Sequence, residues 1–104
     1  MTLDVNPSSP LGVFDSGVGG LSVLKAVHQV LPDESTIYLA DQAHVPYGRR
    51  PLEEVQSYAE AISSYLLSKG VKLIVVACNT ATAAAVPVLR QTMPVPIVGM
   101  EPAV

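Results

Sequence analysis

The sequence predicts an α/β fold in which a parallel four-stranded sheet is layered between helices. Short apolar runs alternate along the chain with longer segments whose apolar residues repeat at helical spacing. One run, residues 71–77 (VKLIVVA), is continuously apolar, which is typical of a strand buried on both faces of a parallel sheet. Because strands joined through helices form right-handed crossovers, we expect all four strands to be parallel.

The first half of the chain contains two of these strands. Residues 1–10 are expected to form a flexible amino-terminal arm, and residues 11–104 a partial domain. An apolar run at 11–14 stops at Asp15, and a glycine-rich loop leads into a helix over 21–31. Pro32 and Asp33 end that helix, and the β-branched and aromatic run 36–40 is the second strand.

The second half repeats the alternation. A helix is predicted from about Pro51 to Lys69, closed by Gly70, and the strand 71–77 follows it. Asn79 or Thr80 is expected to cap a third helix that begins at about Ala81. Pro87 must kink this helix or split it into two pieces. The fourth strand is expected at 95–100. Since the sequence stops directly after it, with no helix to cover it, we expect a truncated domain, a fragment of a longer protein.

Composition excludes several classes of protein. The 104 residues have a formal net charge of -3 and are 49% hydrophobic and 14% charged, which is the reverse of a disordered chain. The mild acidity, without a basic run, argues against nucleic acid and membrane surfaces as partners. No apolar run reaches the roughly 20 residues of a membrane span. The single cysteine, Cys78, forms no internal disulfide, so we expect a cytoplasmic protein.

Polar residues follow the carboxyl ends of the predicted strands. In open α/β sheets, ligands bind at this carboxyl edge. If the strand order is 2-1-3-4, the ends of strands 1 and 3 are neighbours, and Asp15 and Cys78 face each other. The residues at this edge are Asp15, Ser16, Gly17, Asp41, Cys78, Asn79, Thr80, Gly99, Met100 and Glu101.

Cys78 and Asp15 each have a structural and a chemical interpretation. A lone cysteine at a strand end is commonly a small buried apolar residue, but the positive end of a helix would stabilise its thiolate as a nucleophile or base. Asp15 either caps the first helix or accepts a proton beside the thiol. Ser16, Asn79 and Thr80 add hydroxyl and amide groups, a setting that suits a ligand carboxylate.

A nucleotide site is a weaker alternative. Gly17 and Gly19 after a strand, with Asp41 ending the second strand, partly match a dinucleotide fingerprint. The third glycine position is Ser22, however, and Asp15 would place a negative charge beside the pyrophosphate. We therefore expect no cofactor.

The loop after the second strand offers further candidates. Pro46, Tyr47 and Gly48 form a turn whose tyrosine either packs or closes over a small ligand with its hydroxyl. Arg49 and Arg50 are expected to be solvated. The pattern assigns no role to His28 or His44, and one cysteine with two scattered histidines predicts no metal site.

Taken together, the motifs resemble the amino-terminal part of the glutamate racemases, in the aspartate/glutamate racemase superfamily. They are GVFDSGVGGLSVL, the loop VPYG, the segment VVACNTATAAA and the closing VPIVGMEPA, in that order. The resemblance covers nearly everything from Leu11 onward. It implies a flavodoxin-like half of the racemase fold and cofactor-independent interconversion of L- and D-glutamate, which supplies D-glutamate for peptidoglycan.

By the same resemblance, two cysteines flank the substrate Cα. Cys78 matches the first and Asp15 the carboxylate that assists it. The resemblance also implies a homodimer when the protein is complete. Positions that hold the substrate are matched by Ser16, Pro46, Tyr47, Gly48, Asn79 and Thr80.

Two departures from the family pattern stand out. The second cysteine is absent from this sequence, and Gln42 follows Asp41 where the family more often has a hydroxyl residue. Three alternatives stay open. They are a related aspartate or hydantoin racemase, a maleate isomerase, and a non-enzymatic half-racemase that binds a ligand or a protein.

Overall fold

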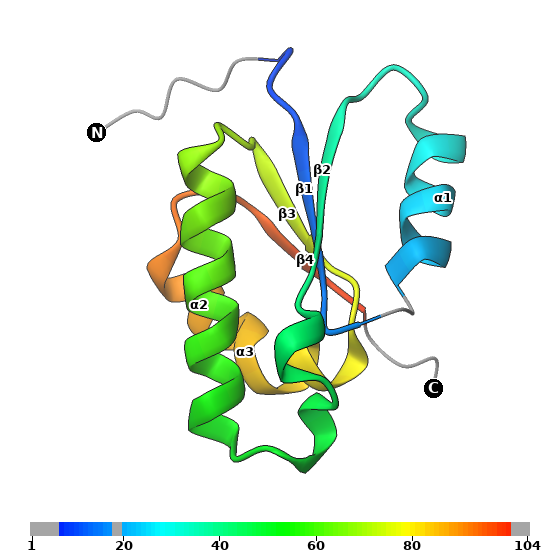
Figure 1. Cartoon of the computed structure of the whole chain (residues 1–104). Helices are drawn as coiled ribbons and strands as arrows, with labels where there is room; N and C mark the ends of the chain where they lie inside the picture. Colours follow the sequence, from blue (N-terminus) through cyan, green and yellow to red (C-terminus); the bar gives the residue numbers. More distant parts are fainter. Residues whose placement is uncertain (1–6, 18–19, 101–104) are drawn as a thin grey trace.

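A computed structural model of the chain describes residues 7–17 and 20–100. Residues 1–6 of the expected arm, Gly19 of the partial fingerprint and Glu101 lie outside the described residues. The described segments alternate strand and helix as the sequence predicts (Figure 1). In chain order the elements are β1 (Leu11–Asp15), α1 (Gly20–Val30), β2 (Thr36–Ala40), η1 (Gln42–His44), η2 (Tyr47–Arg49), α2 (Leu52–Ser68), β3 (Leu73–Val76), α3 (Asn79–Thr92) and β4 (Ile97–Gly99).

The four strands form one parallel sheet in the order β2-β1-β3-β4. This is the order on which the predicted meeting of Asp15 and Cys78 depends. Val13 at the centre of β1 pairs with Tyr38 of β2 on one side and Val75 of β3 on the other. The expected parallel sheet layered between helices is thereby confirmed. Figure 1 shows α1 on one face of the sheet and α2 and α3 on the other.

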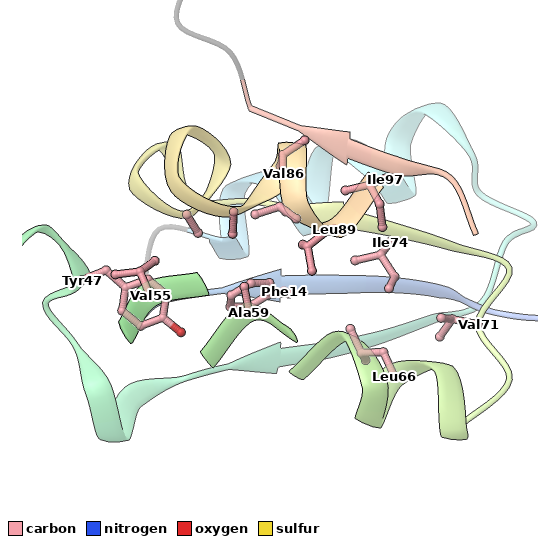
Figure 2. Packing of buried hydrophobic residues seen from close by; sticks show 13 residues of the cluster. Phe14, Tyr47, Val55, Ala59, Leu66, Val71, Ile74, Val86, Leu89 and Ile97 are labelled. Carbon is pink, nitrogen blue, oxygen red and sulfur yellow. The ribbon is translucent and has the colours of Figure 1, made fainter. Parts of the chain in front are cut away.

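Most of the buried apolar side chains lie between the sheet and the pair α2 and α3. Burial of these side chains is the main favourable contribution to folding. Gly70, at a φ of +80°, ends the last turn of α2 in the left-handed region, where a side chain would be strained. Figure 2 shows the cluster, which includes Phe14, Tyr47, Val55, Ala59, Leu66, Ile74, Val76, Ala85, Leu89 and Ile97.

Two expectations for α3, its first residue and its capping side chain, are wrong. The helix begins at Asn79, two residues earlier than expected, and the capping side chain is that of Cys78. The extended backbone of Cys78, with φ −135° and ψ 125°, directs its sulfur to the N–H of Ala81. Pro87 does not split the helix. It lies on the exposed side of an alanine-rich segment, so the hydrogen bond that it removes is on the solvent side.

Candidate functional site

Four of the predicted site residues line one cavity at the carboxyl edge of the sheet. Asp15 and Ser16 come from the end of β1, and Cys78 and Asn79 from the turn between β3 and α3. The cavity has a volume of about 360 Å³. The sheet order brings these two strand ends together, although Asp15 and Cys78 are 63 positions apart in the chain. Val23, Ala77 and Met100 complete the lining.

Cys78 is the central group of this cavity. Its Sγ lies 3.2 Å from Ser16 Oγ, to which the thiol donates. The same sulfur accepts the backbone N–H of Ala81 at 3.4 Å. The thiol is half-buried, and the first-turn N–H groups of α3 make its surroundings favourable to negative charge. The sulfur is also open to a ligand, because it lines the cavity.

Asp15 lies beside the thiol in a buried position. Its residue is 3% exposed, and its Oδ1 accepts the backbone N–H of Ser16 at 2.8 Å. Tyr38 of β2 adds a hydroxyl on the same side. Burial, followed by the charge of Asp15 and a hydrogen bond to it, raises the pKa of Tyr38, so this hydroxyl stays protonated. The tyrosine O–H also donates to the carbonyl of Gly17 at 3.5 Å.

A second cavity adjoins the turn that carries Tyr47. It has a volume of about 320 Å³, and Tyr47, Gly48 and Thr80 contribute to its lining. Thr80 is the second residue of α3, so the start of this helix borders both cavities. Pro46 is exposed between Val45 and Tyr47, at the entrance to the turn. The predicted site residues thus form two adjacent groups, which meet at the start of α3.

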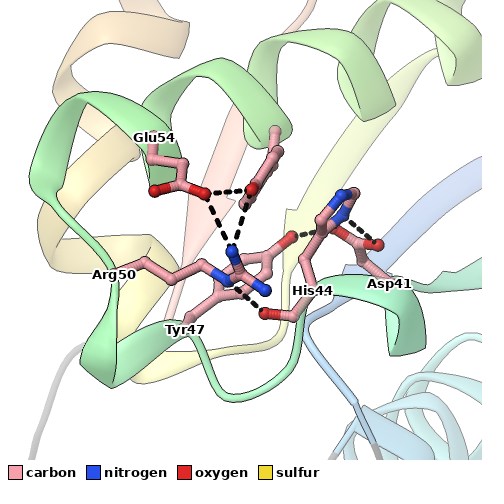
Figure 3. A network of polar contacts seen from close by, with 6 residues as sticks. Asp41, His44, Tyr47, Arg50 and Glu54 are labelled. Atoms are coloured by element: carbon pink, nitrogen blue, oxygen red, sulfur yellow. Dashed lines mark hydrogen bonds and ion pairs between the residues drawn. The ribbon is translucent and has the colours of Figure 1, made fainter.

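The side chain of Tyr47 packs in the core, as one of its two interpretations states. The residue is 2% exposed, and its hydroxyl donates to Asp41 Oδ2 at 2.6 Å (Figure 3). Burial and the hydrogen bond to Asp41 raise the pKa of Tyr47 far above the ordinary value of a tyrosine. The backbone of Pro46–Gly48 is therefore the part of this turn that faces outward, and the phenol is its anchor.

Several residues of the site region are not singled out by the sequence pattern. Tyr38 lies within a predicted strand, and only the pairing of β1 with β2 places it near Asp15. Thr82 Oγ1 accepts the backbone N–H of Met100 at 2.9 Å and donates to the carbonyl of Val76 at 3.4 Å, joining the ends of β3 and β4. The sequence signal for Thr82 is its spacing: it lies four residues after Cys78, which puts the two residues on the same side of α3.

Arg50 differs from expectation, and His44, to which the sequence pattern assigns no role, has defined partners. Arg50 is not a solvated surface residue, because its guanidinium binds the carbonyl of His44 and the carboxylate of Glu54. His44 Nδ1 lies 2.8 Å from both carboxylate oxygens of Asp41.

Neither a metal site nor a membrane-spanning helix is found among residues 7–17 and 20–100. Within these ranges no group of three or more His, Cys, Asp or Glu side chains is arranged to hold a metal ion. Over the same part of the chain, no helix has the length and apolar character to cross a membrane.

The carboxyl edge of this parallel α/β sheet presents a thiol, a carboxylate, a hydroxyl and an amide. A domain with these groups at its edge can exchange protons with a small carboxylate ligand. The chain belongs to the Asp/Glu/Hydantoin racemase family, whose model matches residues 12–104.

Curated relatives and solved structures agree with this assignment. The chain is 57% identical over 93 residues to a glutamate racemase of Methylococcus capsulatus, covering 89% of this chain and 34% of the relative. It superposes on a Thermus thermophilus glutamate racemase in complex with β-chloro-D-alanine at a TM-score of 0.88 and 54% identity, over 91% of this chain and 37% of the other. An Escherichia coli glutamate racemase in complex with L-glutamate and the activator UDP-MurNAc-Ala matches at a TM-score of 0.86 and 39% identity, over 92% and 37%.

The chain therefore spans little more than a third of the length of these relatives. The family model, which matches residues 12–104, spans both groups of predicted site residues and all of the described sheet except Leu11.

Proposed function

We propose that this chain supplies one half of the active site of a glutamate racemase, a cofactor-independent enzyme that interconverts L- and D-glutamate by two-base proton transfer. The observation that carries the proposal is the single cavity that holds Cys78, Asp15, Ser16 and Asn79. In the complete protein a second thiol, from outside these 104 residues, would face Cys78 across the substrate Cα.

The chemistry of racemisation matches this half-site. The Cys78 thiolate removes the α-proton and becomes a thiol, while the opposite thiol gives its proton to the other face and becomes a thiolate. Charge is conserved in this exchange, and the reverse reaction uses the same groups with their roles exchanged. Ser16 Oγ accepts from the thiol in the structure and can donate to the thiolate after the proton is lost, since a hydroxyl does both.

The neighbouring groups suit an amino-acid substrate. Backbone N–H groups in the first turn of α3, with the side chains of Asn79 and Thr80, can hold the α-carboxylate, where charge develops in the transition state. Asp15 would assist proton transfer at Cys78, and the turn Pro46–Gly48 would contact the rest of the substrate. The choice of glutamate is supported by the identity to glutamate racemases. As part of the same proposal, the complete protein would be a cytoplasmic homodimer that supplies D-glutamate for peptidoglycan.

A hybrid enzyme tests the proposal. Residues 12–100 would replace the matching segment of the Methylococcus capsulatus relative, and racemisation would be followed in deuterated water. We expect an active hybrid in which Cys78→Ser impairs α-proton exchange from the two enantiomers unequally. An inactive hybrid that folds, or full activity in Cys78→Ala, would contradict the proposal. The isolated 104-residue chain carries a single thiol and should not racemise glutamate.

Asp15→Asn in the same hybrid separates a chemical from a structural role. The amide keeps the size and much of the hydrogen bonding of the carboxylate but lacks its charge. We expect kcat to fall by about 100-fold with the melting temperature nearly unchanged. A loss of stability with retained turnover would assign Asp15 a structural role.

A further inference from the structure

The loop between β2 and α2 is held in place by side chains more than by its backbone. Its two short helical turns, η1 and η2, each contain three residues. The backbone hydrogen bonds from His44 to Asp41 (3.3 Å) and from Arg50 to Tyr47 (3.0 Å) each close a single turn. Tyr47 is the one buried residue of η1 and η2. A loop of this kind stays ordered only if other contacts fix it.

Asp41 fixes one end of the loop. Its carboxylate accepts the hydroxyl of Tyr47 at 2.6 Å and the Nδ1–H of His44 at 2.8 Å (Figure 3). Its backbone N–H donates to the carbonyl of Asp15 at 2.8 Å, which joins it to the last residue of β1. Asp41 therefore connects the loop directly to the strand that carries the candidate site.

Four side chains fix the other end, and we refer to them as the loop clasp: His44, Arg50, Glu54 and Tyr58. The His44 ring stacks on Tyr58 with 3.8 Å between ring centroids and 17° between planes.

Within the loop clasp, Arg50 connects the loop to the first turns of α2, where Glu54 and Tyr58 lie. It donates from Nε to the carbonyl of His44 at 2.7 Å and from Nη1 to Glu54 at 2.8 Å and to the Tyr58 hydroxyl at 3.1 Å. Tyr58 also donates to Glu54 (Figure 3). A planar guanidinium that serves three acceptors fixes direction as well as distance.

The loop held in this way borders the candidate site. Val45 Cγ2 lies 3.2 Å from the point that a Cβ at Gly17 would occupy, so the loop packs against the turn after β1. No heavy atom lies within 4 Å of the corresponding point at Gly48, which leaves the backbone there open to a ligand. His44, Glu54 and Tyr58 are absent from the linings of both cavities, whereas Arg50 borders the second one. The first three residues therefore act on the site through the position of the loop.

We propose that the loop clasp holds the Pro46–Gly48 backbone ready for the substrate and thereby sets its affinity, a role that rests on the proposed racemase function. A loop that is already ordered does not lose conformational freedom when the ligand binds. His44 and Tyr58 are positioning residues in this scheme, and Arg50 combines that role with a place in the lining of the second cavity. Their loss weakens binding with little effect on the proton-transfer step.

Matched substitutions test the proposal in the hybrid enzyme. Tyr58→Phe, outside both linings, is expected to raise KM about threefold with kcat within about twofold of the parent. Arg50→Ala, which also removes a side chain from the lining of the second cavity, is expected to raise KM about tenfold. Arg49→Ala removes the same charge one residue earlier, and Tyr65→Phe removes the same hydroxyl from the exposed side of α2; both should leave KM unchanged. A structural role alone would lower the folded fraction, and hence apparent kcat, without raising KM.

Hydrogen exchange in the 104-residue chain gives a second readout that needs no enzymatic activity. Arg50→Ala and His44→Phe should increase exchange of the loop amides between Gln42 and Arg50 while the amides of α3 keep their protection. Unchanged loop exchange, or KM values equal to those of the two controls, would overturn the loop clasp. An inactive hybrid with the expected change in exchange would reject the racemase function and leave the ordering role intact.

Discussion

The two faces of the sheet are packed very differently. On the face covered by α2 and α3, thirteen buried side chains of the described residues form one cluster around Phe14, Leu66 and Ile74. On the face covered by α1, the described residues give a buried cluster of Val13, Val75 and Ala77, with Val23, Leu24, Tyr38 and Leu73 partly buried against it. Apolar residues of α1 and the residue after it remain exposed, with Leu21 at 59%, Val30 at 75% and Leu31 at 45%.

The two clusters stand in different relations to the candidate site. Ala77 of the small cluster and Val23, which packs against it, both line the cavity that contains Cys78. The large cluster supports Cys78, which packs against it from one side. Its most deeply buried side chains should therefore contribute most to stability, and the following predictions test this through unfolding of the 104-residue chain.

Removing a large side chain from the well-packed face should have the largest effect. Leu66→Ala is expected to lower the free energy of unfolding by about 2–5 kcal/mol, because the side chain is fully buried between α2 and the sheet. The same substitution at the exposed Leu21 should change it by less than about 0.5 kcal/mol. Urea unfolding measures both values. Equal losses would show that the two faces contribute alike.

Adding a methyl group where α3 meets β4 should cost less. A Cβ at Gly99 would lie 2.6 Å from Thr82 Cγ2, so Gly99→Ala is expected to destabilise the fold by about 1–3 kcal/mol. Gly48→Ala is the control, since its Cβ would meet no atom within 4 Å. Thermal unfolding of the two variants distinguishes them. A tolerated Gly99→Ala would mean that α3 and β4 separate easily.

Removing one buried polar group from the well-packed face should increase stability. Ser63 is buried in α2, and its Oγ has no hydrogen-bond partner among the described residues. Ser63→Ala should raise the free energy of unfolding by about 1 kcal/mol more than Ser64→Ala, its exposed neighbour on the same helix. The pair shares the gain in helix propensity, so the difference reports the buried hydroxyl alone. A difference of zero, measured by urea unfolding, would imply that the hydroxyl is satisfied.

The smallest expected effect is a loss of stability at alkaline pH. The pKa of Tyr47 is raised in the fold, whereas in the unfolded chain this phenol ionises near pH 10. Its contribution is thus fully present below about pH 10 and declines above it, by about 0.8 kcal/mol at pH 10.5. Tyr47→Phe should reduce the decline by that amount, whereas the exposed Tyr65→Phe should not. The free energy of unfolding is measured at pH 8 and 10.5. A decline in Tyr47→Phe equal to that of the parent chain would contradict the assignment.

Much of the fold could be predicted because its signals are local. The continuous apolar run at 71–77 identifies a central strand, and the strand 36–40 has the predicted bounds. The carboxyl-edge rule, combined with the order of the strands, also predicts that Asp15 and Cys78 meet.

The remainder depends on side-chain direction, which spacing does not encode. Nothing in the sequence pattern says that the sulfur of Cys78 itself caps α3, because cysteine is not among the usual capping residues. The inward direction of the Tyr47 ring and the hydrogen bond from the Arg50 guanidinium to Glu54 likewise depend on where the start of α2 lies relative to β2.

The close contact between Gly99 and Thr82 also constrains how this protein can change over generations. Thr82 occupies the space that a side chain at position 99 would need, and its hydroxyl binds both Val76 and Met100. In a lineage that acquires alanine at 99, a smaller residue at 82 relieves the closest contact, and serine would preserve the hydroxyl while removing the obstructing methyl group. The two positions should therefore change together, with Gly–Thr and Ala–Ser the better-packed combinations and Ala–Thr the destabilised one.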